Sequence, residues 1–280
     1  MKIITPLQYV DETTEVVANY VLKYTPQIFR LLDRENEIFE PVGSSVLIQF
    51  NDRKFLITAS HLYYEYESLY FFRDNHFHLL VGKFVYTNPN KSNLSKFTDI
   101  LVCEIDQESN KFLTNHYNFV DAKLINFDYY PETQKNFLIF GYPWRKTRFN
   151  KIKNKFKIIP FKFLTEIYNG TISNELKTFD DQLLILDYNQ REIINTKTGF
   201  KKKSVMPEGL SGCGVWHIPN IINLNQIQFN LVGILIRQDE FNKKYVIATR
   251  IHIISEILRV YFNVNLQKSR ITVLEKNNFY

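Results

Sequence analysis

The sequence is poor in cysteine, in glycine and in long hydrophobic runs. Only two cysteines, Cys103 and Cys213, occur among 280 residues, too few for the disulfide framework of many secreted domains. No run approaches the roughly 18 apolar residues that a membrane-spanning helix needs. Near the N-terminus, Asp11 and Glu12 come too early to leave room for the apolar stretch of a signal peptide. We therefore expect a cytoplasmic protein that does not associate with a membrane.

Net charge is also modest, at +6 for this length. The positive excess is concentrated in two clusters, residues 145–157 and residues 201–203. Such clusters can bind nucleic acid or an acidic partner, but solvated loops of a basic protein are the simpler interpretation. Hydrophobic residues make up 45% and charged residues 23%, the balance of an ordinary globular protein. The length allows one large domain or two small barrels that share an interface.

The first 41 residues differ in pattern from the rest. Residues 11–33 have the spacing of an amphipathic helix, and the acidic residues at its start favour a helix N-terminus. Pro26 would kink this helix or divide it in two. We therefore predict a helical extension, residues 1–41, ahead of the core fold.

From Val42 onward the chain predicts many short strands. Apolar, β-branched and aromatic runs alternate with Asn, Asp, Gly and Pro, the pattern of an all-β sandwich or barrel. Helical spacing returns at residues 250–262, and residues 263–280 form a tail. A boundary between two β halves is expected near residues 120–136. The fold class is therefore mainly β, with helices at both ends.

Three short segments carry residues suited to nucleophilic chemistry. His61 follows a predicted strand, and Asp99 stands at the head of another apolar strand. Ser211 lies among three glycines in the segment PEGLSGCGVW, residues 207–216. Each has a structural explanation by itself: a surface histidine, an aspartate in a turn, and a tight glycine turn. Their joint occurrence is less easily explained in that way.

The order of the three residues along the chain excludes some classes of serine hydrolase. Histidine, aspartate and serine occur in that order, at separations of 38 and 112 residues. The α/β-hydrolases have the order serine, acid, histidine, and the subtilisins have aspartate, histidine, serine. The α/β-hydrolase elbow also needs glycine at the position that Cys213 occupies.

These segments resemble the motifs of the trypsin-like serine peptidases, which have the chymotrypsin fold. TASH resembles the family's T-A-x-H, TDILV its D-[IL]-A-[LV], and GLSGCG its G-D-S-G-G-P. The resemblance covers residues 42–262 and implies a chymotrypsin-like double β-barrel of an intracellular bacterial type. Barrel 1 would span about residues 42–125 and barrel 2 about 136–249, before the C-terminal helix. Membership of a larger signalling or defence system is a further expectation.

The resemblance also implies roles for the three residues. Ser211 would be the nucleophile, His61 the general base, and Asp99 the group that orients the imidazole. The backbone N–H groups of Gly209 and Ser211 would form the oxyanion hole. It implies a protein substrate, and we expect neither a metal nor another cofactor.

Two positions depart from the family pattern. Leu210 stands where extracellular members carry an aspartate that pairs with a newly cut N-terminus. Activation by cleavage therefore has no obvious anchor, and we expect control by a regulatory protein partner or a ligand. Cys213 raises the alternative of a viral-type cysteine nucleophile, but that motif needs glycine at the position of Ser211. We prefer Ser211 as nucleophile and Cys213 as a packing residue.

The substrate pocket can be placed by the same resemblance. None of its expected positions is acidic, so we expect an apolar or small side chain before the cleaved bond rather than Arg or Lys. The floor and walls are expected at Val205, Ile236, Arg237, Gln238, Val246 and Ile247.

Two other functions stay open. The chain could be a catalytically latent binding module that uses a protease fold to recognise a protein partner. It could also be a nucleic-acid-associated protein that uses its basic clusters, in which case binding would weaken with added salt.

Overall fold

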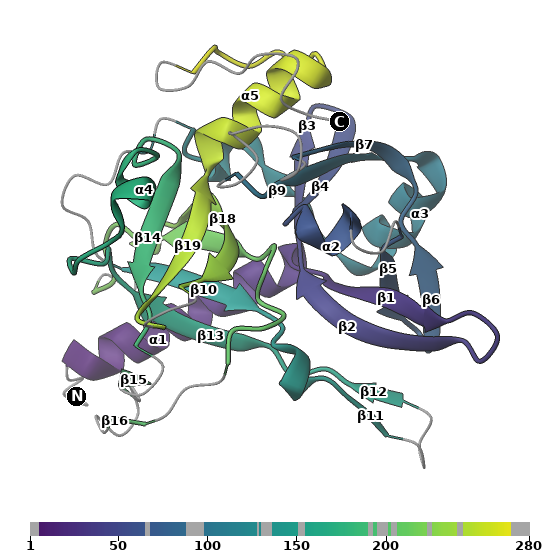
Figure 1. The fold of residues 1–280 in the computed structure, drawn as a ribbon, viewed down its shortest axis with the longest axis horizontal. Helices are drawn as coiled ribbons and strands as arrows, with labels where there is room; N and C mark the ends of the chain where they lie inside the picture. Colours follow the sequence, from purple (N-terminus) through teal and green to yellow (C-terminus); the bar gives the residue numbers. More distant parts are fainter. Residues whose placement is uncertain are drawn as a thin grey trace.

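The structure is a computed structural model that places most of the chain. It describes residues 6–64, 68–87, 98–127, 129, 136–150, 155–189, 193–194, 201–202, 206–222, 226–239 and 243–269. Figure 1 shows two strand-rich halves side by side, the first on the right and the second on the left. Within the described residues, no helix is long and apolar enough to cross a membrane.

The first half consists of two sheets. One has the strand order β2-β1-β5-β6, and the other has the order β7-β8-β4-β3-β9. Neighbouring strands are antiparallel, except that β3 and β9 run parallel. The elements are β1 (Gln27–Asp33), β2 (Ile38–Ser44), β3 (Val46–Phe50), β4 (Arg53–Thr58), α2 (His61–Tyr64), β5 (Tyr70–Arg73), β6 (His76–Leu79), β7 (Gly82–Tyr86), β8 (Leu101–Ile105), α3 (Gln107–His116) and β9 (Val120–Asp121).

The second half is built on one antiparallel sheet with the strand order β13-β10-β17-β18-β19-β14. Two small two-stranded ribbons, β11-β12 and β15-β16, are appended to it. The elements are η2 (Ala122–Leu124), β10 (Phe137–Gly141), η3 (Trp144–Lys146), β11 (Arg148–Asn150), β12 (Lys155–Lys157), β13 (Phe161–Thr165), α4 (Asn174–Lys177), β14 (Leu183–Asp187), β15 (Ile193–Ile194), β16 (Lys201–Lys202), β17 (Gly214–His217), β18 (Asn230–Gln238), β19 (Tyr245–Arg250) and α5 (Ile251–Tyr261).

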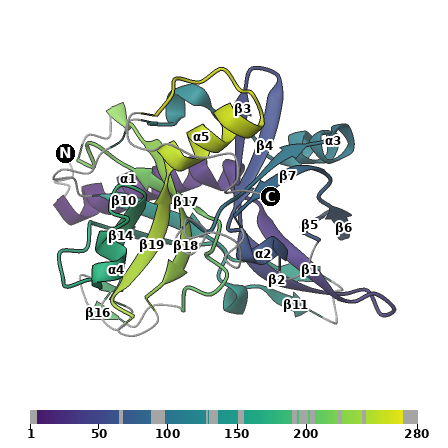
Figure 2. The same ribbon diagram turned by 45° about the horizontal axis from the view of Figure 1, so that its top comes forward.

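Helices at the two ends of the chain pack against the two halves. The N-terminal α1 (Pro6–Val21) continues into η1 (Leu22–Tyr24) and packs on the second half, where the Thr13 hydroxyl donates to the Ile221 carbonyl at 2.7 Å. Helix α5 follows β19 directly and crosses toward the first half (Figure 2). Arg53 and Lys83 of the first half donate hydrogen bonds to carbonyls at its C-terminal end. Cationic side chains are favourable there because a helix C-terminus carries partial negative charge.

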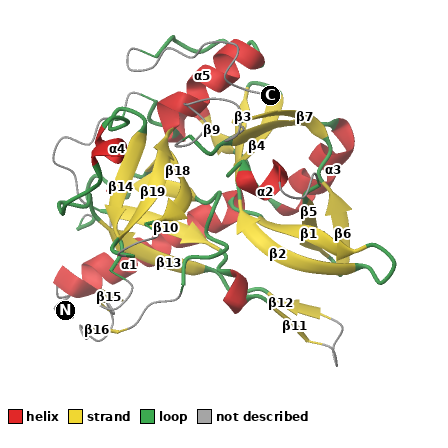
Figure 3. Ribbon diagram, viewed as in Figure 1, coloured by secondary structure: helices red, strands yellow, loops and turns green. Residues whose placement is uncertain are grey.

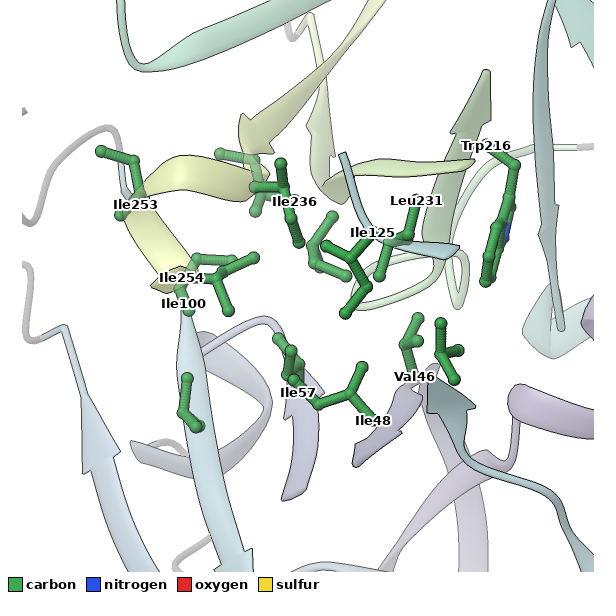
Figure 4. Packing of buried hydrophobic residues seen from close by; sticks show 14 of the residues in the cluster. Val46, Ile48, Ile57, Ile100, Ile125, Trp216, Leu231, Ile236, Ile253 and Ile254 are labelled. Atoms are coloured by element: carbon green, nitrogen blue, oxygen red, sulfur yellow. The ribbon is translucent and has the colours of Figure 1, made fainter. Parts of the chain in front are cut away.

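A shared hydrophobic core joins the two halves. Figure 4 shows branched aliphatic side chains of strands β3 and β4 facing those of the second half and of α5. All of the labelled residues are buried in this cluster, namely Val46, Ile48, Ile57, Ile100, Ile125, Trp216, Leu231, Ile236, Ile253 and Ile254. Because close-packed interiors resist deformation, the loops at the junction are held in a defined geometry.

The predicted mainly β fold with helices at both ends is confirmed, as Figure 3 shows by its colours. The helix expected at residues 11–33 is correct only in its first part. Residues after Pro26 form strand β1, which pairs with β2 and buries Ile28 and Phe29. Proline removes a helical hydrogen bond, and pairing within the sheet then decides the conformation. Strand β1 therefore belongs to the first half, although it precedes the predicted domain start at residue 42.

Helix α3 was not predicted. Its apolar pattern is weak, since only Ser109 and Leu113 are buried, but Asp106 is a capping signal that could have been noticed. The Asp106 carboxylate accepts a hydrogen bond from the Ser109 amide at 2.8 Å, the usual function of a residue before a helix.

Candidate active site

His61 and Asp99 are brought together by neighbouring strands of the first half. His61 begins α2 just after β4, and Asp99 lies just before β8, which pairs with β4. Because the two strands are antiparallel, the end of β4 and the beginning of β8 lie at the same edge of the sheet. The His61 Nδ1 atom lies 2.5 Å from Asp99 Oδ2.

Asp99 is held by further hydrogen bonds. Its Oδ1 atom accepts from the Ser60 hydroxyl at 2.6 Å and from the His61 amide at 2.9 Å. The Ser60 hydroxyl also lies 3.0 Å from the Thr87 hydroxyl. Burial by itself would raise the pKa of Asp99, but the hydrogen bonds and the nearby His61 charge outweigh it and hold the pKa below its ordinary value. Asp99 is therefore a carboxylate at neutral pH.

Ser211 lies in a loop of the second half made of two successive turns. The Leu210 amide donates to the Pro207 carbonyl at 2.8 Å, and the Cys213 amide donates to the Leu210 carbonyl at 3.0 Å. The third residue of each turn is a glycine with positive φ, 90° at Gly209 and 87° at Gly212. Type II turns need this conformation at that position, and glycine adopts it without steric cost.

The same hydrogen bonds set the direction of two amides. The Glu208 carbonyl accepts from the Trp144 amide at 3.0 Å, and the described residues contain no cis peptide bond. In a planar trans peptide the C=O and N–H point in opposite directions, so the Gly209 N–H points away from Trp144. The Leu210 carbonyl accepts from the Cys213 amide, so the Ser211 N–H likewise points away from that amide. Within the described part of the chain, neither N–H donates a hydrogen bond, so both are available to a negatively charged oxygen.

His61 and Ser211 face the same cleft, which has a volume of about 360 Å³. The Ser211 hydroxyl donates to the Ile236 carbonyl at 3.0 Å, and no hydrogen bond within the described residues joins it to His61. Rotation about the Cα–Cβ bond of Ser211 would redirect its hydroxyl. Catalytic hydrogen bonds are often long or unformed without a substrate, so this arrangement is compatible with a resting enzyme.

The expected pocket residues are divided by the structure. Ile236, Arg237 and Gln238 line the cleft beside Ser211. Val246 and Ile247 lie instead in the interior, because strand β19 is covered on both faces and is buried along its whole length. Val205 lies outside the described residues. So do residues 151–154 and 203 of the two basic clusters.

The cleft also has charged residues that the sequence analysis missed. Glu208, Asp239 and Lys243 line it together with Arg237, so both signs of charge are present. Asp239 is buried and acts on Tyr245, whose pKa is raised first by burial and then by the Asp239 charge and hydrogen bond. Asp239 follows the predicted wall residue Gln238 directly, and extending that wall by one residue would have found it.

Cys213 and Leu210 flank Ser211 but face the interior. Both are fully buried in the same core cluster of the second half. Burial raises the pKa of the Cys213 thiol far above neutral, so that it is not a thiolate at physiological pH. This disfavours the cysteine nucleophile and assigns Cys213 to packing. Leu210 likewise contributes apolar volume rather than an ion pair.

Similarity to known proteins is visible only at the level of structure. No known protein family and no curated protein matches the sequence. The protease Anisep from Arthrobacter nicotinovorans has 12% identity and a TM-score of 0.50, over 84% of this chain and 94% of that one. The HtrA-type protease AlgW, solved with a tripeptide, has 15% identity and a TM-score of 0.51, over 88% of this chain. This chain covers 62% of AlgW, less than two thirds of its length. These likenesses and the two β halves show that the chain has the chymotrypsin-like fold of the trypsin-like serine peptidases.

Proposed function

We propose that this protein is a serine endopeptidase in which His61, Asp99 and Ser211 form the catalytic triad. The observation that carries the proposal is the hydrogen-bonded His61–Asp99 pair across one cleft from Ser211. The chain brings these residues together from positions 38 and 112 residues apart. His61 comes from the first half and Ser211 from the second, and both line one cleft. This placement in a peptidase fold supports an acyl-transfer site.

In the proposed reaction, Ser211 attacks the carbonyl carbon of the scissile peptide bond. His61 takes the hydroxyl proton at Nε2, because its Nδ1 is bonded to Asp99. The amides of Gly209 and Ser211 then bind the oxyanion of the tetrahedral intermediate. His61 passes its proton to the leaving amine, and an acyl-enzyme remains. Water activated by His61 then hydrolyses the ester and restores Ser211.

Asp99 supports both the formation and the hydrolysis of the acyl-enzyme. Its lowered pKa keeps it ionised, so it can hold the imidazole in one tautomer and stabilise the imidazolium that forms. The Ser60 hydroxyl and the His61 amide satisfy its other oxygen. A buried carboxylate without such donors would be costly.

We also propose that a protein partner or a ligand controls the activity. Leu210 is buried among apolar side chains, so the position directly before Ser211 offers no carboxylate to receive a newly formed N-terminus. Activity that appeared only after N-terminal trimming would contradict this part of the proposal. A second candidate, a latent binding module, is favoured by the Ser211 hydroxyl pointing to Ile236 rather than to His61.

Labelling of the full chain with a fluorophosphonate probe tests the catalytic assignment. We expect the unaltered chain to react and Ser211→Ala to lose labelling completely. The labelling rate of His61→Ala should fall by at least roughly 10³-fold. Ser255→Ala, at a buried serine of α5, is the matched control and should label normally. Labelling that survives Ser211→Ala would overturn the assignment. A chain that neither labels nor cleaves unfolded protein substrates would favour the binding module.

A further inference from the structure

Ser44 is a fully buried residue at the end of β2 that contacts the loop of Ser211. Its hydroxyl donates to the Gly209 carbonyl at 3.0 Å and accepts from the Tyr142 amide at 2.9 Å. Its amide donates to the Ser211 carbonyl at 2.8 Å. Its own carbonyl accepts from the Thr58 hydroxyl at 2.7 Å. One residue of the first half therefore binds two carbonyls of a loop in the second half.

We propose that Ser44 is a positioning residue that holds residues 207–211 in the shape of an oxyanion hole. The inference rests on the proposed function, since it concerns the stabilisation of that reaction's intermediate. Ser44 does not touch the reacting atoms, and it acts through Gly209 and Ser211.

The hydrogen bonds explain how the turn is held. The peptide before Gly209 is fixed because its carbonyl, on Glu208, accepts from Trp144. The peptide after Gly209 is fixed because its carbonyl accepts from the Ser44 hydroxyl. Rotating the first peptide would break the Trp144 bond and turn the Gly209 N–H away from its present direction. Rotating the second would break the Ser44 bond and change the backbone conformation of Gly209. The left-handed conformation of Gly209 is thus held from both sides.

The Ser44 hydroxyl also links two loops of the second half. It bonds to Tyr142 in one loop and to Gly209 in the other, and Trp144 of the first loop bonds back to Glu208. The space is closely filled, since a Cβ added to Gly141 would lie 2.8 Å from the Ser44 hydroxyl oxygen. Loss of this hydroxyl would leave a buried carbonyl and a buried amide without their partner, which is costly in a protein interior.

The hydrogen bonds of Ser44 anchor the Ser211 loop, which Leu210 cannot do. A leucine at that position packs into the second-half core and offers no ion pair to hold the loop. Hydrogen bonds from the first half take that role, so the shape of the loop depends on how the two halves are docked. No cleavage of the chain is needed to form it.

Ser45 provides a closely matched control for Ser44. Both serines are fully buried, and each donates its hydroxyl to a backbone carbonyl. The Ser45 hydroxyl donates to the Pro26 carbonyl at 3.2 Å and, within the described residues, makes no hydrogen bond to the loop of Ser211. Ser44→Ala and Ser45→Ala therefore remove the same atom from adjacent buried positions, with different consequences for the oxyanion hole.

The experiment measures peptide hydrolysis by the full chain with each substitution. We expect Ser44→Ala to lower kcat by about 10- to 100-fold, less than the 10²–10³ typical of losing a whole oxyanion donor. KM should change by less than about 3-fold, and the pH profile should keep its shape, because neither substrate binding nor His61 is altered. Ser45→Ala should stay within about 3-fold of the unaltered chain in both constants. Ser44→Cys retains a weak hydrogen-bond donor, so its kcat should lie between those of Ser44→Ala and Ser45→Ala.

Amide hydrogen exchange of residues 208–213 provides a readout that needs no turnover. We expect exchange there to be faster in Ser44→Ala than in Ser45→Ala or in the unaltered chain. Equal kcat values for the two alanine variants would overturn the inference, as would faster exchange with unchanged kcat. If Ser211→Ala still labels with the fluorophosphonate, the proposed function fails instead. The exchange comparison would then still decide whether Ser44 holds the loop.

Discussion

The two halves of the molecule contribute to the site in different ways. The first half holds a charged pair by side-chain hydrogen bonds, with Ser60 and the His61 amide on the Asp99 carboxylate. The second half holds Ser211 by main-chain hydrogen bonds and by two glycines with positive φ. The groups around Asp99 thus tune charge, whereas the Ser211 loop, held in part by Ser44 of the first half, sets the direction of amides. Changes to the groups around Asp99 should therefore alter the pH dependence of the reaction, whereas changes to the Ser211 loop, or to Ser44 that holds it, should alter only its rate.

The largest effect is expected from Asp99→Asn. We expect kcat/KM at pH 7 to fall by about 10⁴-fold, because an amide can donate to His61 Nδ1 and favour the wrong tautomer. The acidic limb of the pH profile should move to lower pH, since the protonated imidazole loses its neighbouring negative charge. Steady-state kinetics between pH 5 and pH 9 measure both effects. Asp52→Asn, in an exposed turn, is the control, and a loss below 10-fold in Asp99→Asn would contradict the first-half mechanism.

A smaller loss, without a pH shift, is expected from Gly209→Ala. Its φ of 90° is strained for alanine, and the added Cβ would lie 2.5 Å from the Trp144 amide nitrogen. We expect kcat to fall by about 10²- to 10³-fold, the range for losing one oxyanion donor. Gly170→Ala is the control, because Gly170 is exposed, has no positive φ, and the atoms nearest to an added Cβ belong to the Tyr168 side chain. A moved acidic limb in Gly209→Ala would show that the two halves do not act separately.

Ser60→Ala should have a weaker effect on the charged pair. We expect kcat/KM to fall by about 3- to 10-fold, because Asp99 loses one of its charge-assisted hydrogen bonds. With that donor gone, the pKa of Asp99 should rise toward its ordinary value, and the carboxylate should attract the imidazolium proton more strongly. The acidic limb should therefore move to higher pH, opposite to its movement in Asp99→Asn. Movement in the same direction in both variants would contradict this account.

The smallest effect concerns acid stability. Burial lowers the pKa of His252, in α5, and of His217, in β17, to about 4, so both are neutral in the folded protein. Between pH 6.5 and pH 4 the unfolded chain binds more protons, so the free energy of unfolding should fall as the pH drops through this window. His252→Leu should reduce that fall by on the order of 2 kcal/mol. Denaturant unfolding at pH 7 and pH 4 measures it, with His76→Leu, at an exposed position, as control. An unchanged difference between the two pH values in His252→Leu would contradict the prediction.

Local patterns were sufficient for much of the fold. Most of the strands after Val42 and the final helix were predicted because alternation and helical spacing reflect burial directly. Strand β1 was not, because its pairing with β2 and β5 depends on residues elsewhere in the chain. Val246 and Ile247 were expected in the substrate pocket, but a strand covered on both faces buries every side chain. Whether an apolar residue lines a cleft or a core is settled by the layers around it.

The sequence by itself determined the types and the order of the reactive residues, since His61, Asp99 and Ser211 stand in short segments with recognisable neighbours. It also determined the glycines that permit two tight turns around Ser211. Tertiary structure alone decided that Ser44 bonds to that loop and that Asp239 lies in the cleft. These contacts join residues from different sheets or loops, and no local propensity encodes them. They exist because packing of the two halves places a particular hydroxyl, amide or carboxylate within hydrogen-bonding distance of a distant group.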